Sequence, residues 1–123
     1  MSSIPSFFRL AKNVSKLSNH RYKMGCCIVS SGRVISVGCN QIKTHPDAWH
    51  TGLHCEMVAI RNSAHDFNLK GSSIFVYRES RKTGLPAMAR PCKYCMAELK
   101  KEGFKWIYYS TNEYPYWESE KIK

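Results

Sequence analysis

The sequence has few acidic residues and no long apolar run. Nine Asp and Glu residues stand against 19 Lys and Arg residues, which gives a formal net charge of +10. No apolar run approaches the roughly 20 residues of a transmembrane helix, and residues 1–10 lack the apolar centre of a secretory signal. We therefore expect a cytoplasmic protein with no membrane partner. The positive charge indicates either anionic partners or a well-solvated surface, and it does not separate the two.

Internal repeats, low-complexity tracts and linker segments are also missing from the sequence. Its 123 residues suit one domain, since a single core typically serves about 100–200 residues. The hydrophobic content of 43% excludes a disordered polyelectrolyte. We predict a single domain over residues 1–123, with residues 110–123 forming a C-terminal tail that can dock on it.

Cysteines are too few and too unevenly spaced for a disulfide scaffold. The chain has six, and this usage is more typical of an intracellular metal or thiol protein than of a secreted one. Cys26, Cys27 and Cys39 lie in two short β-rich runs, where we expect them to be small core residues. The other three, Cys55, Cys92 and Cys95, lie in or beside motifs that carry chemistry.

Apolar periodicity and turn residues predict an α/β fold. The predicted helices cover residues 6–18, 55–66 and 92–102, and the predicted strands cover residues 24–30, 33–39, 73–77 and 104–109. The first two strands form an antiparallel hairpin, and long loops cover residues 40–53 and 78–91. The order α-β-β-α-β-α-β predicts a single mixed β-sheet with helices on both faces.

Two short motifs combine metal-binding residue types at the starts of two predicted helices. They are His-Cys-Glu at residues 54–56 and Pro-Cys-Lys-Tyr-Cys at residues 91–95. Cys92 and Cys95 share one helix face, and a helix N-terminus favours the thiolates that bind metal. With His54 they form a three-ligand zinc set that leaves a fourth position open, as in catalytic sites. Glu56 is then a carboxylate placed to move protons beside the metal.

Less specific interpretations of the same residues also exist. A structural zinc site could be completed by Cys55, Cys26 or another residue, and Cys92 with Cys95 could be a redox pair. Glu56 alone could be an acidic residue that the helix dipole favours in a first turn. These interpretations leave the joint occurrence of Glu56 and Pro91 with the three ligands unexplained.

The two motifs together resemble the signature of the zinc-dependent cytidine/deoxycytidylate deaminase superfamily, H-x-E followed by P-C-x-x-C. Gly38–Cys39–Asn40 and Thr44–His45–Pro46 resemble segments of deoxycytidylate-type members, and the resemblance covers roughly residues 8–110. It implies that His54, Cys92 and Cys95 hold Zn²⁺. It also implies that Glu56 transfers protons between water, the pyrimidine ring and the departing amine.

The resemblance also implies which residues contact the substrate. Asn40 matches the family residue that hydrogen-bonds the sugar or base, and the backbone N–H of Cys55 would hold the base carbonyl. His45 is a candidate for the wall of the substrate cleft. Arg90 belongs to a basic group that can attract a phosphate, or that can simply be solvated. This group consists of Arg78, Arg81, Lys82, Arg90 and Lys93.

These residues favour hydrolytic deamination of the cytosine base in a small nucleotide, dCMP- or cytidine-like, giving the uracil product and ammonia. The first alternative, which the +10 charge favours, is a deaminase acting on cytosine or adenine within single-stranded DNA or RNA such as tRNA. The second is a non-catalytic, zinc-stabilised nucleic-acid-binding module, against which Glu56 argues. The resemblance also implies a homo-oligomer. Little chain follows Tyr109, so the fifth strand of the family sheet is either missing or built from the tail.

Overall fold

The computed structural model describes residues 4–19, 22–40, 54–63 and 68–122. Within these residues lie three helices, α1 (Ile4–Ser15), α2 (Cys55–Asn62) and α3 (Lys93–Lys101). The strands are β1 (Met24–Ser30), β2 (Arg33–Cys39), β3 (Ser73–Glu79), β4 (Pro86–Ala87), β5 (Trp106–Ser110) and β6 (Trp117–Lys121). None of the helices in this part of the chain is both long and apolar enough to cross a bilayer.

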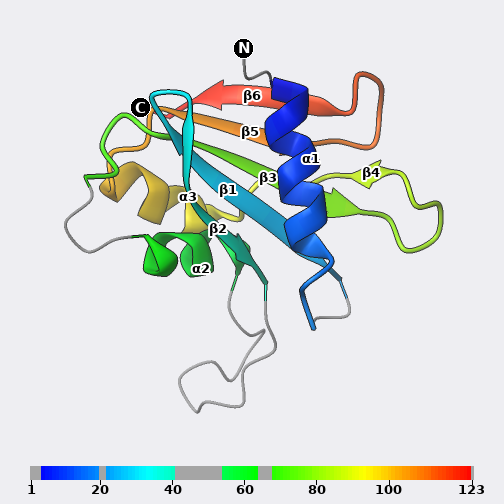
Figure 1. Cartoon of the computed structure of the whole chain (residues 1–123). Helices are drawn as coiled ribbons and strands as arrows, with labels where there is room; N and C mark the ends of the chain where they lie inside the picture. The colour runs from blue at the N-terminus through cyan, green and yellow to red at the C-terminus, as the bar shows by residue number, and fades with distance from the viewer. Residues whose placement is uncertain (1–3, 20–21, 41–53, 64–67, 123) are drawn as a thin grey trace.

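All strands belong to one mixed sheet (Figure 1). Its order is β2-β1-β3-β5-β6, and β4 pairs with β3 beside this path. β1 is antiparallel to β2 and β3, whereas β3 and β5 are parallel and β5 and β6 are antiparallel. The α/β class and the single mixed sheet predicted from the sequence are confirmed.

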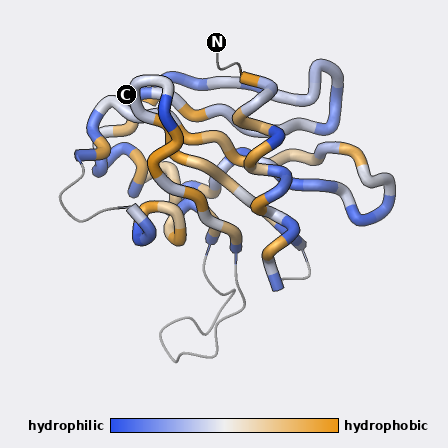
Figure 2. Tube along the Cα trace, viewed as in Figure 1, coloured by the Kyte–Doolittle hydropathy of each residue, from blue (hydrophilic) through white to orange (hydrophobic). Residues whose placement is uncertain are grey.

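Helices cover both faces of the sheet, also as predicted. Successive residues of β1 point to opposite faces. Cys26 and Ile28 pack in one cluster with Ala59 of α2 and Leu99 of α3, whereas Cys27 packs in another with apolar residues of α1. The central strands are accordingly the most apolar part of the trace (Figure 2). Cys26, Cys27 and Cys39 are buried, which confirms them as core thiols.

The predicted loop over residues 78–91 is partly wrong. β3 continues to Glu79, and Pro86 and Ala87 form β4 opposite its end. The turn between them is closed by hydrogen bonds that join Ser80 to Leu85 and Gly84. Gly84 has a φ of 73°, a conformation that side chains disfavour. Pro86 suits this edge position because an edge residue needs no second ladder hydrogen bond.

The question of the fifth strand is resolved by the C-terminal tail. Residues 117–121 form β6, which pairs along the whole of β5. Trp117 packs beside Phe8 of α1 and Tyr108 of β5, with both ring-centroid distances at 6.1 Å. The tail therefore docks on the body as an edge strand of the sheet.

Helix α2 lies unusually close to strand β2. A Cβ atom built on Gly38 would lie 2.5 Å from the backbone nitrogen of Ala59 and 2.8 Å from the carbonyl oxygen of Cys55. The Ser36 hydroxyl donates to the Ala59 carbonyl at 2.5 Å, and the Asn62 amide donates to the Val37 carbonyl at 3.0 Å. Glycine at position 38 thus allows contact that fixes the first turn of α2 against the sheet.

Candidate active site

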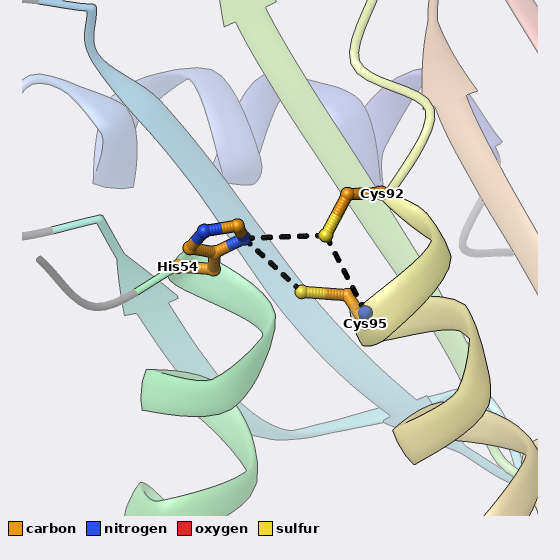
Figure 3. A group of neighbouring side chains, drawn as sticks. All are labelled: His54, Cys92 and Cys95. Atoms are coloured by element: carbon orange, nitrogen blue, oxygen red, sulfur yellow. Dashed lines mark hydrogen bonds between the residues drawn. The ribbon is translucent and has the colours of Figure 1, made fainter. Parts of the chain in front are cut away.

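The starts of α2 and α3 bring three metal-binding side chains together (Figure 3). The His54 Nδ1 atom lies 3.2 Å from the Cys95 Sγ atom and 3.6 Å from the Cys92 Sγ atom. His54 is the residue before the first turn of α2, and Cys92 holds the same position in α3. The backbone N–H of Cys95 points to the Cys92 sulfur at 3.5 Å, as in a helix cap.

The donor set of this group fits zinc. One imidazole nitrogen and two sulfurs lie within 4.8 Å of one another, and these are the ligand types that Zn²⁺ prefers. Cys95 is buried and Cys92 is exposed, so the group is reached from solvent on the Cys92 side. Burial raises the pKa of the Cys95 thiol, so binding of a cation there would displace a proton.

A fourth ligand from Cys55 or Cys26 is not favoured by the geometry. In the described part of the chain, the group of candidate metal ligands consists of His54, Cys92 and Cys95. The Cys55 thiol points to the Glu56 carboxylate at 3.3 Å, and the Cys26 thiol donates to the Cys55 carbonyl at 3.1 Å. Three protein ligands leave a position for water or substrate, which is the arrangement of a catalytic zinc site.

Glu56 is a carboxylic acid buried in the first turn of α2, with 2% of its surface exposed. Burial raises the pKa of its carboxyl group, while hydrogen bonds from its own backbone N–H and from Cys55, and the charge of His54, lower it in part. The negative charge of Glu56 in turn contributes to the raised pKa of Cys95. Glu56 follows His54 by two residues at the start of the same helix, and a carboxyl group of raised pKa is chemically suited to accept and release a proton.

The backbone at His54 explains how residues 54 and 56 can serve one site. Positions two apart on an ideal helix point about 200° away from each other. His54 has φ −71° and ψ 147°, which is extended rather than helical backbone. The imidazole therefore leaves the helix at its edge and can face α3, while Glu56 points inward.

The cytidine and deoxycytidylate deaminase zinc-binding region matches residues 1–111 of the chain. The chain belongs to this family. No curated protein sequence matches it.

Solved structures of two deaminases share the fold of this family member. One is dCMP deaminase from the cyanophage S-TIM5 in apo form, with 24% sequence identity and a TM-score of 0.66 over 87% of this chain and 81% of that chain. The other is cytidine deaminase from Burkholderia pseudomallei, with 18% identity and a TM-score of 0.75 over 98% of this chain and 94% of that chain. At these identities the likeness shows the cytidine deaminase fold.

The residues expected to contact the substrate do not all lie in the described part of the chain. His45 lies outside the described residues. Asn40 is buried, and its Oδ1 atom accepts hydrogen bonds from Ser18 Oγ at 2.7 Å and from the Met24 backbone N–H at 2.8 Å. Its Nδ2 atom donates to the Tyr22 carbonyl at 2.6 Å. The Asn40 side chain therefore joins three segments of this deaminase fold, whatever else it binds.

Arg90 forms an ion pair with the C-terminal strand. Its Nε and Nη2 atoms donate to the two carboxylate oxygens of Glu120 at 2.6 and 3.1 Å. The Tyr109 hydroxyl donates to the same carboxylate at 2.6 Å. These contacts join β5 and β6 to the residues just before Cys92. The sequence held no signal for Glu120, because the tail had no strand-like pattern.

Proposed function

We propose that the chain catalyses zinc-dependent hydrolytic deamination of the cytosine base in a small nucleotide, dCMP- or cytidine-like. The products are the uracil derivative and ammonia. The main supporting observation is the buried Glu56 carboxyl group in the first turn of α2, the helix that begins at His54, one member of the three-ligand group with Cys92 and Cys95 of α3. The choice of a nucleotide is supported by the fold it shares with a cyanophage dCMP deaminase that was crystallised in complex with dCMP and dUMP.

Each residue of the site would have a separate role in this reaction. His54, Cys92 and Cys95 would hold Zn²⁺, which when bound supplies a Lewis acid that lowers the pKa of water. Glu56 would accept a proton from the attacking water and pass it to the ring nitrogen N3. It would then help transfer a proton to the departing amine, so that water adds at C4 and ammonia leaves. The backbone N–H of Cys55 would hold the base carbonyl.

The 5′-phosphate would be held by the basic group near the zinc ligands. Arg78 donates to the Met88 carbonyl at 3.3 Å, and its guanidinium lies 5.9 Å from the ring centroid of Tyr22. Arg90 is already paired with Glu120, so a phosphate there would compete with that carboxylate. A carbonyl and an aromatic ring do not neutralise the Arg78 guanidinium as Glu120 neutralises Arg90, so Arg78 is the better candidate of the two to bind a nucleotide phosphate. Asn40 would contact the sugar or base.

The test is ammonia release from cytosine, cytidine, deoxycytidine, dCMP, dCTP and oligonucleotides that contain C or A, at two salt concentrations. We expect turnover of dCMP or cytidine by the zinc-loaded chain. Glu56→Gln should lower kcat by about 10²-fold or more and keep both the zinc content and the fold. Glu118→Gln, which changes an exposed carboxylate on β6, is the matched control.

Two results would overturn the proposal. The first is normal deamination by Glu56→Gln, which would remove the catalytic assignment. The second is activity confined to oligonucleotides, with a steep salt dependence and none on dCMP or cytidine, which would identify a polynucleotide substrate instead.

A further inference from the structure

The Cys55 thiol contacts the carboxylate that the proposed reaction needs. Its sulfur lies 3.3 Å from the Glu56 Oε1 atom, and the two residues are 0% and 2% exposed. An ionised carboxylate only accepts hydrogen bonds, so the S–H group must be the donor. A buried carboxylate requires such donors, and among the described residues the Cys55 thiol supplies one.

Cys55 is itself held in place from two sides. The Cys26 thiol of β1 donates to the Cys55 carbonyl at 3.1 Å. Gly38 of β2 brings its backbone so close to the same carbonyl that an added Cβ would lie 2.8 Å from it. The backbone of Cys55 is therefore fixed by two strands of the sheet, and the short, buried side chain that it carries starts from a fixed point.

Glu56 needs this external support because of its own geometry. The terminal torsion of a glutamate side chain has broad, shallow preferences, so its carboxylate rotates readily unless a partner holds it. Proton transfer by a general base depends on placing one oxygen within hydrogen-bond reach of the proton. A donor on Oε1 restricts that rotation and leaves the other oxygen for the reaction.

We propose that Cys55 is a positioning residue that orients the Glu56 carboxylate through an S–H···O hydrogen bond. This inference rests on the proposed function. It gives the side chain at position 55 a role in this chain beyond that of its backbone N–H. Sequence spacing gave no hint of it, because adjacent helical positions do not normally face each other.

The test compares Cys55→Ala, Cys55→Ser and the control Cys27→Ala in zinc-loaded protein. A thiol is a weak donor, so Cys55→Ala should lower kcat about tenfold, with KM within about twofold and zinc content unchanged. Cys55→Ser supplies an O–H donor and should restore most of the loss. Cys27 is equally buried, but its thiol lies on the α1 face, 3.6 Å from the Phe7 carbonyl, so its removal should leave kcat unchanged.

An infrared measurement tests the hydrogen bond itself, whether or not the protein turns over a substrate. The infrared S–H stretching band that disappears in Cys55→Ala should shift when Glu56→Gln replaces the charged acceptor by a neutral one. An unshifted band, a wild-type kcat in Cys55→Ala, or a kcat loss that serine does not restore would each overturn the positioning role. A wild-type chain that deaminates none of the substrates would refute the proposed function, while the band would still decide the contact.

Discussion

A single methyl group at position 38 should move the helix that carries the candidate site. In Gly38→Ala the new Cβ would lie 2.5 Å from the Ala59 nitrogen and 2.8 Å from the Cys55 oxygen. Both are backbone atoms, so no side-chain rotation can relieve the contact. Ordinary contacts between such atoms lie near 3.5 Å, and α2 must therefore shift by about 1 Å away from β2.

The shift should reduce both stability and activity. Overpacking of this kind typically costs about 1–3 kcal/mol, which lowers the Tm of a chain of this size by several degrees. Helix α2 carries Glu56 and begins next to His54, so the same movement displaces one ligand and the carboxylate relative to α3. A misplacement of about 1 Å can cost on the order of 10²-fold in rate.

The variant Gly25→Ala separates the effect on stability from the effect on activity. A Cβ on Gly25 would collide with the backbone of Ala11 and Ser15 in α1, on the other face of the sheet. Both variants should unfold at lower temperature in a thermal melt followed by circular dichroism. At a temperature where both are folded, only Gly38→Ala should lose kcat in the ammonia assay. Equal kcat losses in the two variants, or an unchanged Tm and kcat in Gly38→Ala, would refute the reasoning.

Two other predictions concern the proposed metal ligands and the C-terminal strand. His54→Ala and Cys92→Ala should each reduce bound zinc from one equivalent per chain to well below it, measured by elemental analysis after dialysis, whereas Cys27→Ala should retain it. Arg90 and Tyr109 lower the pKa of Glu120 by hydrogen bonding, so their contribution to stability is present above the unfolded pKa of about 4.3 and is lost as the pH falls through the lower folded value. Glu120→Gln should therefore lower Tm at pH 7 by an amount worth about 0.2–1 kcal/mol. This difference should shrink as the pH falls through the lowered folded pKa of Glu120; a pH-independent difference would contradict the ion-pair explanation.

The hairpin was predictable to the residue, because its signals are local. Two β-rich runs flank Ser31–Gly32, and both turn residues adopt positive φ values of 52° and 78°. Such a two-residue turn matches the twist of the flanking strands and fixes their pairing beside the turn. The register then shifts between Val29 and Ile28, which the sequence pattern did not predict. The ligand group was also predictable, since each half of the motif begins a helix and each helix follows from its own apolar pattern.

Strand β6 could not be predicted in the same way. Its sequence, Trp-Glu-Ser-Glu-Lys, has few residues that favour strands, and it alternates no apolar face. It is ordered by tertiary contacts instead: pairing with β5, packing of Trp117, and the pair between Glu120 and Arg90. Apart from β5, the residues that hold β6 in place are distant from it in the sequence. A local sequence pattern therefore cannot predict these contacts.

For Asn40, the motif and the structure indicate two different roles. The motif predicts an asparagine that contacts the substrate, whereas the structure shows its amide fixed by Ser18, Met24 and Tyr22. The two roles are compatible, because the contacts among the described residues use both acceptor positions and one N–H, which leaves the second N–H for a ligand. A donor whose rotamer is already fixed by three protein hydrogen bonds loses little entropy when a ligand binds. The scaffold contacts of Asn40 are therefore a reason to expect a strong substrate contact there, provided that the ligand group offers an acceptor.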